Sequence, residues 1–330
     1  SIVAALRAMA PYVHGRSPWD SETIRAALWH RGLWSFRKPT ACFAYVGIDM
    51  ALWDLRGLAC GEPVYNLLGG TVRDEVDYYY YLSRDTPDEL AKQCRQGLKR
   101  GYTVFYLKVG IDIQEEIEMI AAVRDTIGPG RKLRLDANAA WTVSEAIRNL
   151  SLVERFDIDY IEQPVAPDPQ AGMAEVRLRT HVPVCANEGL WTAEDAYRHI
   201  GGRSADVYCF SPYWVGSMTE FQRLAWMAAQ EGSFVCKHSH GELGIAAAAF
   251  HQLLLTTHNI VIGNQHTAHM MCDDVLLDSL PIAASPKWSS SEAPGLGIRV
   301  DEDKVQTYSE HYRREGQYLP YVPHCNYVEK

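Results

Sequence analysis

The 330-residue sequence has no paired cysteine motif, no long apolar run and no excess of basic residues. Its eight cysteines are scattered without a CxxC pair, which favours buried, reduced thiols over disulfides or a zinc site. The net charge of -9 argues against a nucleic-acid partner, because such a partner requires a basic surface. No segment reaches the roughly 18 apolar residues of a membrane span, and no apolar signal-peptide core opens the chain. These absences predict a globular, cytoplasmic protein without a membrane partner.

From Val76 onward the sequence alternates short apolar runs with amphipathic segments. The apolar runs predict eight strands, at 76–82, 104–109, 132–136, 158–162, 183–188, 206–211, 233–238 and 260–265. Capping-box patterns such as Thr142-Val143-Ser144-Glu145 predict the helix starts between them. Eight such units predict an α/β fold closed into a parallel barrel, whose chemistry lies at the carboxyl ends of the strands.

The chain is predicted to divide into three parts. Residues 1–72 are predicted to be helical, with an amphipathic segment over 44–59, and to form the first part of a capping domain. Residues 73–290 form the barrel. Residues 291–330 are predicted to return to the capping domain.

Three acids end predicted strands: Asp136, Glu162 and Glu188. Both intervals between them are 26 residues, since 162 − 136 and 188 − 162 agree, and this is about one strand–helix unit. Equal spacing places the acids on one rim of one sheet. Three carboxylates crowded on a rim repel one another unless a cation joins them, and an all-oxygen site suits Mg²⁺. The spacing therefore predicts a metal site.

A basic residue ends a predicted strand on either side of these acids. Lys108 ends the second strand, and a divalent cation beside it would lower its pKa toward that of a general base. His238 ends the seventh strand, and the phase of the strand favours it over His240.

Neutral residues at the rim are candidates for binding substrate or supporting a ligand. Ser211 and Gln265 end two further strands, and neither would move a proton unaided. Asn138 lies two residues beyond Asp136, where it either supports a ligand or forms an Asx turn. The tyrosine run at 78–81 alternates faces along a strand, so half of it is expected to line the barrel and half to pack against helices. It is interpreted as core, with Tyr80 or Ser83 as candidates near the rim.

Six short motifs carry a family resemblance, and together they extend from about residue 43 to about residue 308. They are GIDMALWD at 47–54, PVYNLLGG at 63–70, YLKVG at 106–110, DAN at 136–138, IEQP at 161–164 and PGLG at 294–297. This set resembles the mandelate racemase and muconate lactonizing enzyme branch of the enolase superfamily.

The resemblance implies a modified (β/α)₇β TIM-like barrel under an α+β capping domain formed by both chain ends. It implies one Mg²⁺ per chain on Asp136, Glu162 and Glu188, a small-molecule carboxylate substrate, and assembly into a homo-oligomer. The shared step is removal of a proton beside the substrate carboxylate, and the superfamily uses a Lys or His base with Mg²⁺. The cap's opening strands and its mobile loop are absent from this sequence, which predicts residues upstream of Ser1.

The sequence departs from the family pattern at three positions. Tyr106 replaces the first lysine of Lys-x-Lys, Ser211 stands where the dyad aspartate falls, and Gln265 takes the place of an acid. Lys108 and His238 keep their positions. The segments around Tyr213 and His238 are most similar to the acid-sugar dehydratases, particularly glucarate dehydratase. Without a dyad aspartate, His238 is better suited to donate a proton than to abstract one.

Three functions follow as hypotheses. The favoured one is a Mg²⁺-dependent dehydratase of a small hydroxylated carboxylate, namely a sugar acid. In it, Lys108 or Tyr106 handles the α-proton and His238 protonates the leaving hydroxyl. The second is a racemase or epimerase that uses Lys108 and His238 as opposed bases. The third is a non-catalytic binder of metal and carboxylate.

Overall fold

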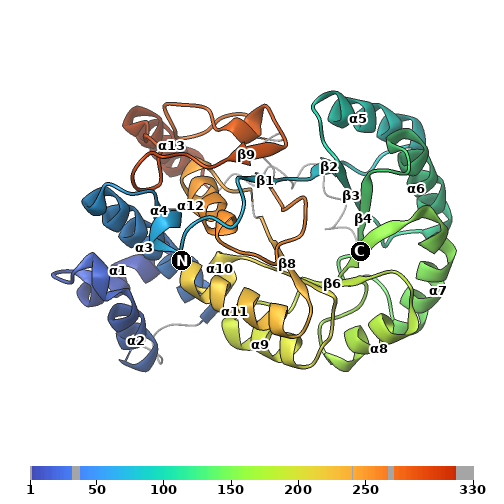
Figure 1. Ribbon diagram of the computed structural model, residues 1–330, viewed down its shortest axis with the longest axis horizontal. Helices are drawn as coiled ribbons and strands as arrows, with labels where there is room; N and C mark the ends of the chain where they lie inside the picture. The colour runs from blue at the N-terminus through green and yellow to red at the C-terminus, as the bar shows by residue number, and fades with distance from the viewer. Residues whose placement is uncertain (1, 32–37, 240, 267–270, 317–330) are drawn as a thin grey trace.

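The computed structural model describes residues 2–31, 38–239, 241–266 and 271–316. Within these ranges, seven parallel strands form one sheet in their order along the chain. They are β2 (Tyr80–Leu82), β3 (Val104–Lys108), β4 (Lys132–Asp136), β5 (Ile158–Glu162), β6 (Val184–Ala186), β7 (Val207–Phe210) and β8 (Phe234–Lys237). Because each strand pairs with the next one in sequence, the sheet curls into a barrel with its helices outside (Figure 1).

Helices connect the strands, and the predicted capping box at 142–145 does begin one of them. They are α5 (Pro87–Lys99), α6 (Ile113–Ile127), α7 (Val143–Val153), α8 (Ala171–Arg179), α9 (Ala193–Gly201), α11 (Met218–Gln230) and α12 (Gly244–Leu255). The side chains of Thr86, Thr142 and Ser217 each accept a hydrogen bond from the amide three residues later. These caps satisfy amide groups that have no partner inside the helix, and they set the direction in which each helix leaves the barrel.

The first and last predicted strands differ from the prediction. The run at 76–82 divides into β1 (Glu75–Asp77), which pairs antiparallel with β9 (Lys287–Ser289), and β2, which joins the barrel. The run at 260–265 is not a strand but closes the ring with isolated bridges, Val235 to Ile260 and Tyr78 to Asn264. The local apolar pattern does not reveal that these two segments meet where the barrel closes, and their pairing there is irregular.

The N-terminal part is helical, as predicted. It contains α1 (Ile2–Val13), η1 (Pro18–Asp20), α2 (Ser21–Arg31), α3 (Lys38–Cys60) and α4 (Val64–Leu67). Met9, Ile24, Tyr45 and Leu52 belong to a buried cluster that joins the first three helices. The carboxylate of Asp49 accepts a 2.9 Å hydrogen bond from the Met218 amide, which ties α3 to the start of α11. The capping helices therefore have a fixed attachment to the barrel.

The segment after the barrel returns to α3. The Leu296 amide donates to Asp54 Oδ1 at 2.7 Å, and the Gly295 carbonyl accepts from the Val64 amide at 3.1 Å. A Cβ on Gly57 would lie 2.6 Å from the Cα of Gly295, so the two backbones approach too closely for a side chain at residue 57. Two further elements belong to this segment. The short helix η4 (Pro281–Ala283) precedes β9, and α13 (Glu302–Glu315) is the last helix of the described chain. The boundaries at 72/73 and 290/291 stay predictions.

None of the helices in the described ranges combines the length and apolarity that crossing a lipid bilayer requires.

Candidate active site

Most of the predicted site residues line one cavity of about 310 Å³ at the carboxyl ends of the strands. Lys108 and Asp136 are register partners at the ends of β3 and β4, and Asp136 is the partner of Glu162 at the end of β5. Glu188 follows β6 by two residues, and His238 directly follows β8. Equal strand phase thus brings together side chains that are up to 130 positions apart in the chain, since 238 − 108 is 130.

One flank of the cavity is a network of charged hydrogen bonds. The Lys108 ammonium donates to Asp136 and, at 2.6 Å, to Asn138 Oδ1. The Asn138 amide nitrogen Nδ2 donates to Glu188 Oε1 at 2.7 Å, and its backbone N–H donates to Asp136 Oδ1 at 2.7 Å. Asn138 has a positive φ of 42°, a left-handed conformation that asparagine tolerates better than most residues. It connects the lysine to two of the three acids.

Tyr106 belongs to the same flank and contacts the same acid, Asp136, as Lys108 does. Its hydroxyl donates to Asp136, and its ring stacks on Tyr79 with centroids 4.6 Å apart. Burial and the Asp136 carboxylate raise the pKa of Tyr106 well above its ordinary value. A phenol in this setting is a neutral donor that holds Asp136 in place, and it is poorly suited to accept a proton.

The opposite flank is aromatic. The ring of His238 stacks on Trp214 with centroids 4.5 Å apart, and Trp214 meets Trp191 edge to face at 4.7 Å. The His238 backbone amide donates to the Phe210 carbonyl at 2.9 Å, which fixes the start of the loop. The indole of Trp214 therefore packs against the imidazole on this flank of the cavity.

Gln265 contacts an acid from the closing segment of the barrel. Its Nε2 lies 3.4 Å from both carboxylate oxygens of Glu162, and its Oε1 accepts from the Ser239 amide at 3.0 Å. It is 3% exposed, so both ends of the amide are used inside the protein.

Ser211 is the predicted rim residue that the structure places elsewhere. Its hydroxyl accepts a 3.1 Å hydrogen bond from the Tyr213 amide and caps the short helix α10 (Pro212–Val215). The side chain of Ser211 is fully buried there and does not line the cavity. His240 lies outside the described residues.

The Asp136 carboxylate contributes to raised pKa values at the other two acids. Burial and the Asp136 carboxylate raise the pKa of Glu162 well above its usual value, and the same two causes raise the pKa of Glu188. Burial lowers the pKa of Lys108, but the charges of Asp136 and Glu162 outweigh this and raise it overall. With the protein's own charges alone, Lys108 is therefore held as an ammonium.

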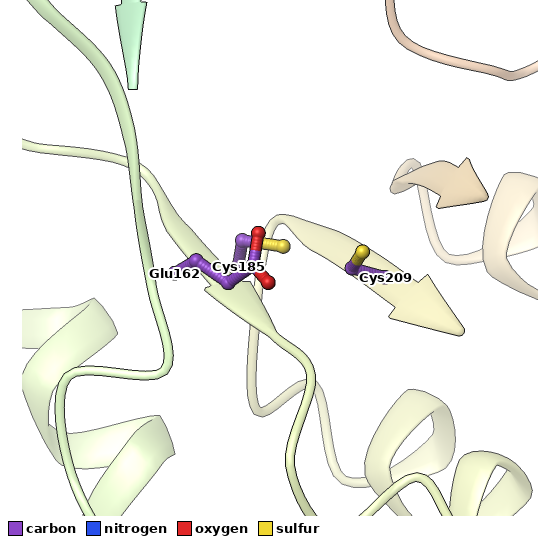
Figure 2. Close-up of side chains that lie close together, drawn as sticks. All are labelled: Glu162, Cys185 and Cys209. Atoms are coloured by element: carbon purple, nitrogen blue, oxygen red, sulfur yellow. The ribbon is translucent and has the colours of Figure 1, made fainter. Parts of the chain in front are cut away.

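The residues present fit a hard divalent cation in atom type and charge. Three carboxylates face one ammonium, and Glu188 Oε2 is a buried atom for which the described part of the chain offers no hydrogen-bond partner. Mg²⁺ prefers such oxygen ligands. A tighter group of possible ligand atoms exists among the described residues. It consists of Glu162, Cys185 and Cys209, whose carboxylate and sulfur atoms lie within 4.8 Å of one another (Figure 2). The three acids share the cavity without being gathered that tightly.

Sequence reasoning expected half of the tyrosine run to line the barrel but did not identify which tyrosines do so, and it missed Trp191 and Trp214. Tyr79 and Tyr81 line the cavity, whereas Tyr80 points the other way and packs against Tyr102 and Phe105. The expectation that Tyr80 lies near the rim was therefore wrong, because its neighbours Tyr79 and Tyr81 line the cavity instead. Alternation along a strand was the available signal, and Tyr106, the register partner of Tyr81, gives the correct phase.

Two family models match the chain. "Enolase C-terminal domain-like" matches residues 89–304, and "Mandelate racemase / muconate lactonizing enzyme, N-terminal domain" matches residues 1–69. Together they cover both the capping helices and the barrel.

Individual relatives differ in their reactions. The chain is 29% identical to D-galactarolactone cycloisomerase of Agrobacterium fabrum over 92% of its own length and 84% of that protein. It is 31% identical to a "probable glucarate dehydratase" of Streptomyces coelicolor, over 78% of this chain and 64% of that one. A crystal structure of the dipeptide epimerase of Enterococcus faecalis V583, complexed with Mg and L-Leu-L-Tyr, is 25% identical with a TM-score of 0.82, covering 90% and 82%.

Cycloisomerases, dehydratases and epimerases thus share this fold at similar distances from the chain, so relatedness alone does not select a reaction. The matched models cover most of the sequence, and the strand-end acids lie where the resemblance places them. The chain belongs to the enolase superfamily, in its mandelate racemase and muconate lactonizing enzyme branch.

Proposed function

We propose that this protein is a Mg²⁺-dependent dehydratase of a small hydroxylated carboxylate, such as a sugar acid. The observation that carries the proposal is the unequal pair of groups on the two sides of the acids. Lys108 donates to Asp136 and Asn138, while the ring of His238 stacks on Trp214. Dehydration needs one base and one acid, whereas racemisation needs two competent bases.

Asp136, Glu162 and Glu188 would hold the cation. The magnesium-bound dipeptide epimerase supports this assignment as a related protein. When bound, the cation supplies positive charge that neutralises the acids, removes the cause of the raised Lys108 pKa and attracts the substrate carboxylate. Tyr106 and Asn138 keep Asp136 and Glu188 oriented through the hydrogen bonds described above.

The protein's own groups then divide the proton transfers. Lys108, as the amine, accepts the proton from the carbon beside the carboxylate. His238, as the imidazolium, donates a proton to the hydroxyl on the next carbon, which leaves as water. The C–H electron pair becomes the new double bond, and the resulting enol tautomerises to a 2-keto acid. Proton exchange with solvent restores both residues.

The test is incubation of the protein and Mg²⁺ with a panel of sugar acids, followed by detection of 2-keto acid. We expect at least one member to yield a keto acid in a reaction that needs both Mg²⁺ and Lys108. Bound Mg²⁺ with no product from any member would count against the proposal.

A racemase or epimerase is the second candidate, because Lys108 and His238 line the same cavity from the third and eighth strands of the chain. Deuterium from solvent at the α-carbon of recovered substrate, with inversion and without loss of water, would select it. Thermal stabilisation by an acid that is never converted would instead support a non-catalytic binder.

A further inference from the structure

A layer of thiols lies directly beneath the carboxylates. Cys185 on β6, Cys209 on β7 and Cys236 on β8 come from three adjacent strands, and each is fully buried. Cys209 and Cys236 are register partners, and all three belong to one small buried cluster with Tyr160 and Val207. Barrel closure therefore gathers thiols that are scattered in the sequence.

Two of these thiols meet one of the acids. The carboxylate of Glu162 and the Sγ atoms of Cys185 and Cys209 lie within 4.8 Å of one another (Figure 2). All three residues are at most 1% exposed. In a tetrahedral zinc site with zinc–sulfur distances of about 2.3 Å, neighbouring ligand atoms lie roughly 3.5–3.8 Å apart. A shift of about 1 Å in side-chain positions would close the group around an ion.

The cavity gives access to this group. Gln265 lines the cavity, and its Nε2 lies 3.3 Å from Cys209 Sγ as well as 3.4 Å from Glu162. Rotation of this one side chain would connect the cavity with the sulfur atom of Cys209.

The donor set selects a class of ion. Thiolate sulfur favours borderline and soft cations such as Zn²⁺ and Cd²⁺, whereas Mg²⁺ binds oxygen and is indifferent to sulfur. We propose that Cys185, Cys209 and Glu162 form a second metal site that takes a thiophilic divalent cation of the Zn²⁺ and Cd²⁺ class. On binding, each ligating thiol loses its proton to solvent, and its sulfur lone pair forms the bond to the ion.

The second site and the first share one residue. Glu162 is one of the three acids that would hold Mg²⁺, so occupation of the thiol site removes a ligand from the Mg²⁺ site. A thiophilic cation would therefore displace Mg²⁺ and inhibit the protein. This competition, unlike the thiol site itself, rests on the proposed function.

The site is tested by titrating the reduced full chain with Cd²⁺, following thiolate-to-cadmium charge-transfer absorption and, by calorimetry, the stoichiometry. The exposed Cys60 and Cys272 are first replaced by serine, so that they do not contribute. We expect one tightly bound Cd²⁺ per chain with release of protons. Cys209→Ser and Cys185→Ser should each abolish the band, whereas Cys94→Ser, equally buried but on α5, should keep it.

An absent band in the folded background protein, or an unchanged band in either site variant, would overturn the proposal. Circular dichroism reports whether each variant is folded, and the two site variants are independent of one another. Saturating Mg²⁺ should weaken Cd²⁺ binding; if Mg²⁺ binds and does not compete, Glu162 is not shared. None of these measurements requires turnover. A protein that binds Cd²⁺ in this way but converts no acid would refute the proposed function and leave the thiol site standing.

Discussion

The Lys108 and His238 flanks of the cavity are held in place by different forces. Lys108 is fixed by ionic hydrogen bonds to Asp136 and Asn138, so its charge and its position depend on the acids. His238 stacks on the face of Trp214, a contact that restricts the orientation of its ring. A base needs its proton affinity adjusted by neighbouring charges, while a proton donor needs to be aimed at its leaving group. The difference between the flanks therefore favours one base and one acid over two equivalent bases.

The largest effect is expected from removing the base. Lys108→Met should reduce turnover by about 10²–10⁴-fold, the usual contribution of a general base, and should also abolish exchange of the α-proton with solvent deuterium. Lys92→Met, an exposed lysine on α5, is the matched control and should behave like the parent. If α-proton exchange survives in Lys108→Met, another group abstracts the proton, and Lys108 is not the base.

Removing the acid should separate two steps that the lysine variant loses together. His238→Asn is expected to lower 2-keto acid formation by about 10²-fold, because general acid catalysis is lost, while α-proton exchange continues. Nuclear magnetic resonance of recovered substrate in deuterated buffer measures both. His258→Asn, an exposed histidine, serves as the control. If His238→Asn loses exchange and dehydration equally, Lys108 and His238 both act as bases. That result would favour a racemase or epimerase.

Breaking the connection inside the charged flank should act through the cation. Asn138→Ala removes the bridge between Lys108 and Glu188, and loss of such a supporting hydrogen bond typically weakens metal affinity about 10–100-fold. Calorimetric titration with Mg²⁺ measures it, and excess Mg²⁺ should restore part of the activity. Asn66→Ala, on α4, is a control at a residue that does not line the cavity. Unchanged Mg²⁺ affinity would show that Asn138 does not support the acids.

The smallest effect is expected from loosening the aromatic flank. Trp214→Phe keeps a ring beside His238 but reduces its area, and aromatic pairs contribute about 0.5–1.5 kcal/mol, or roughly a 2- to 10-fold change in rate. The loss should appear in dehydration and not in α-proton exchange. Trp226→Phe, at an exposed position on α11, is the comparison variant. A drop in exchange equal to the drop in dehydration would show that the two flanks are not independent.

Much of the site could be predicted because a parallel barrel repeats a local unit. Asp136, Glu162 and Lys108 each close an apolar run, and strand direction alone places such residues on the same rim. The helix starts were equally accessible, since a capping hydroxyl such as Thr142 bonds within one turn of the chain.

Other features depended on contacts between distant segments. Ser211 was expected at the rim, but its hydroxyl serves the helix that follows it. Trp191 and Trp214 lie beyond strand ends, and nothing local indicates that the two rings and His238 pack together. The irregular closure of the barrel between Tyr78 and Asn264 is likewise a contact across 186 positions, since 264 − 78 is 186.

The sequence by itself determined the repeating strand–helix units, the rim on which the acids lie and the family to which the motifs point, because each of these follows from short-range pattern and strand direction. Only the tertiary structure decided which faces of the tyrosine run enter the cavity, that Trp214 orients His238, and that Cys185 and Cys209 meet Glu162. These last features arise from the curl and register of the closed sheet, which set distances between residues that the chain itself leaves unrelated.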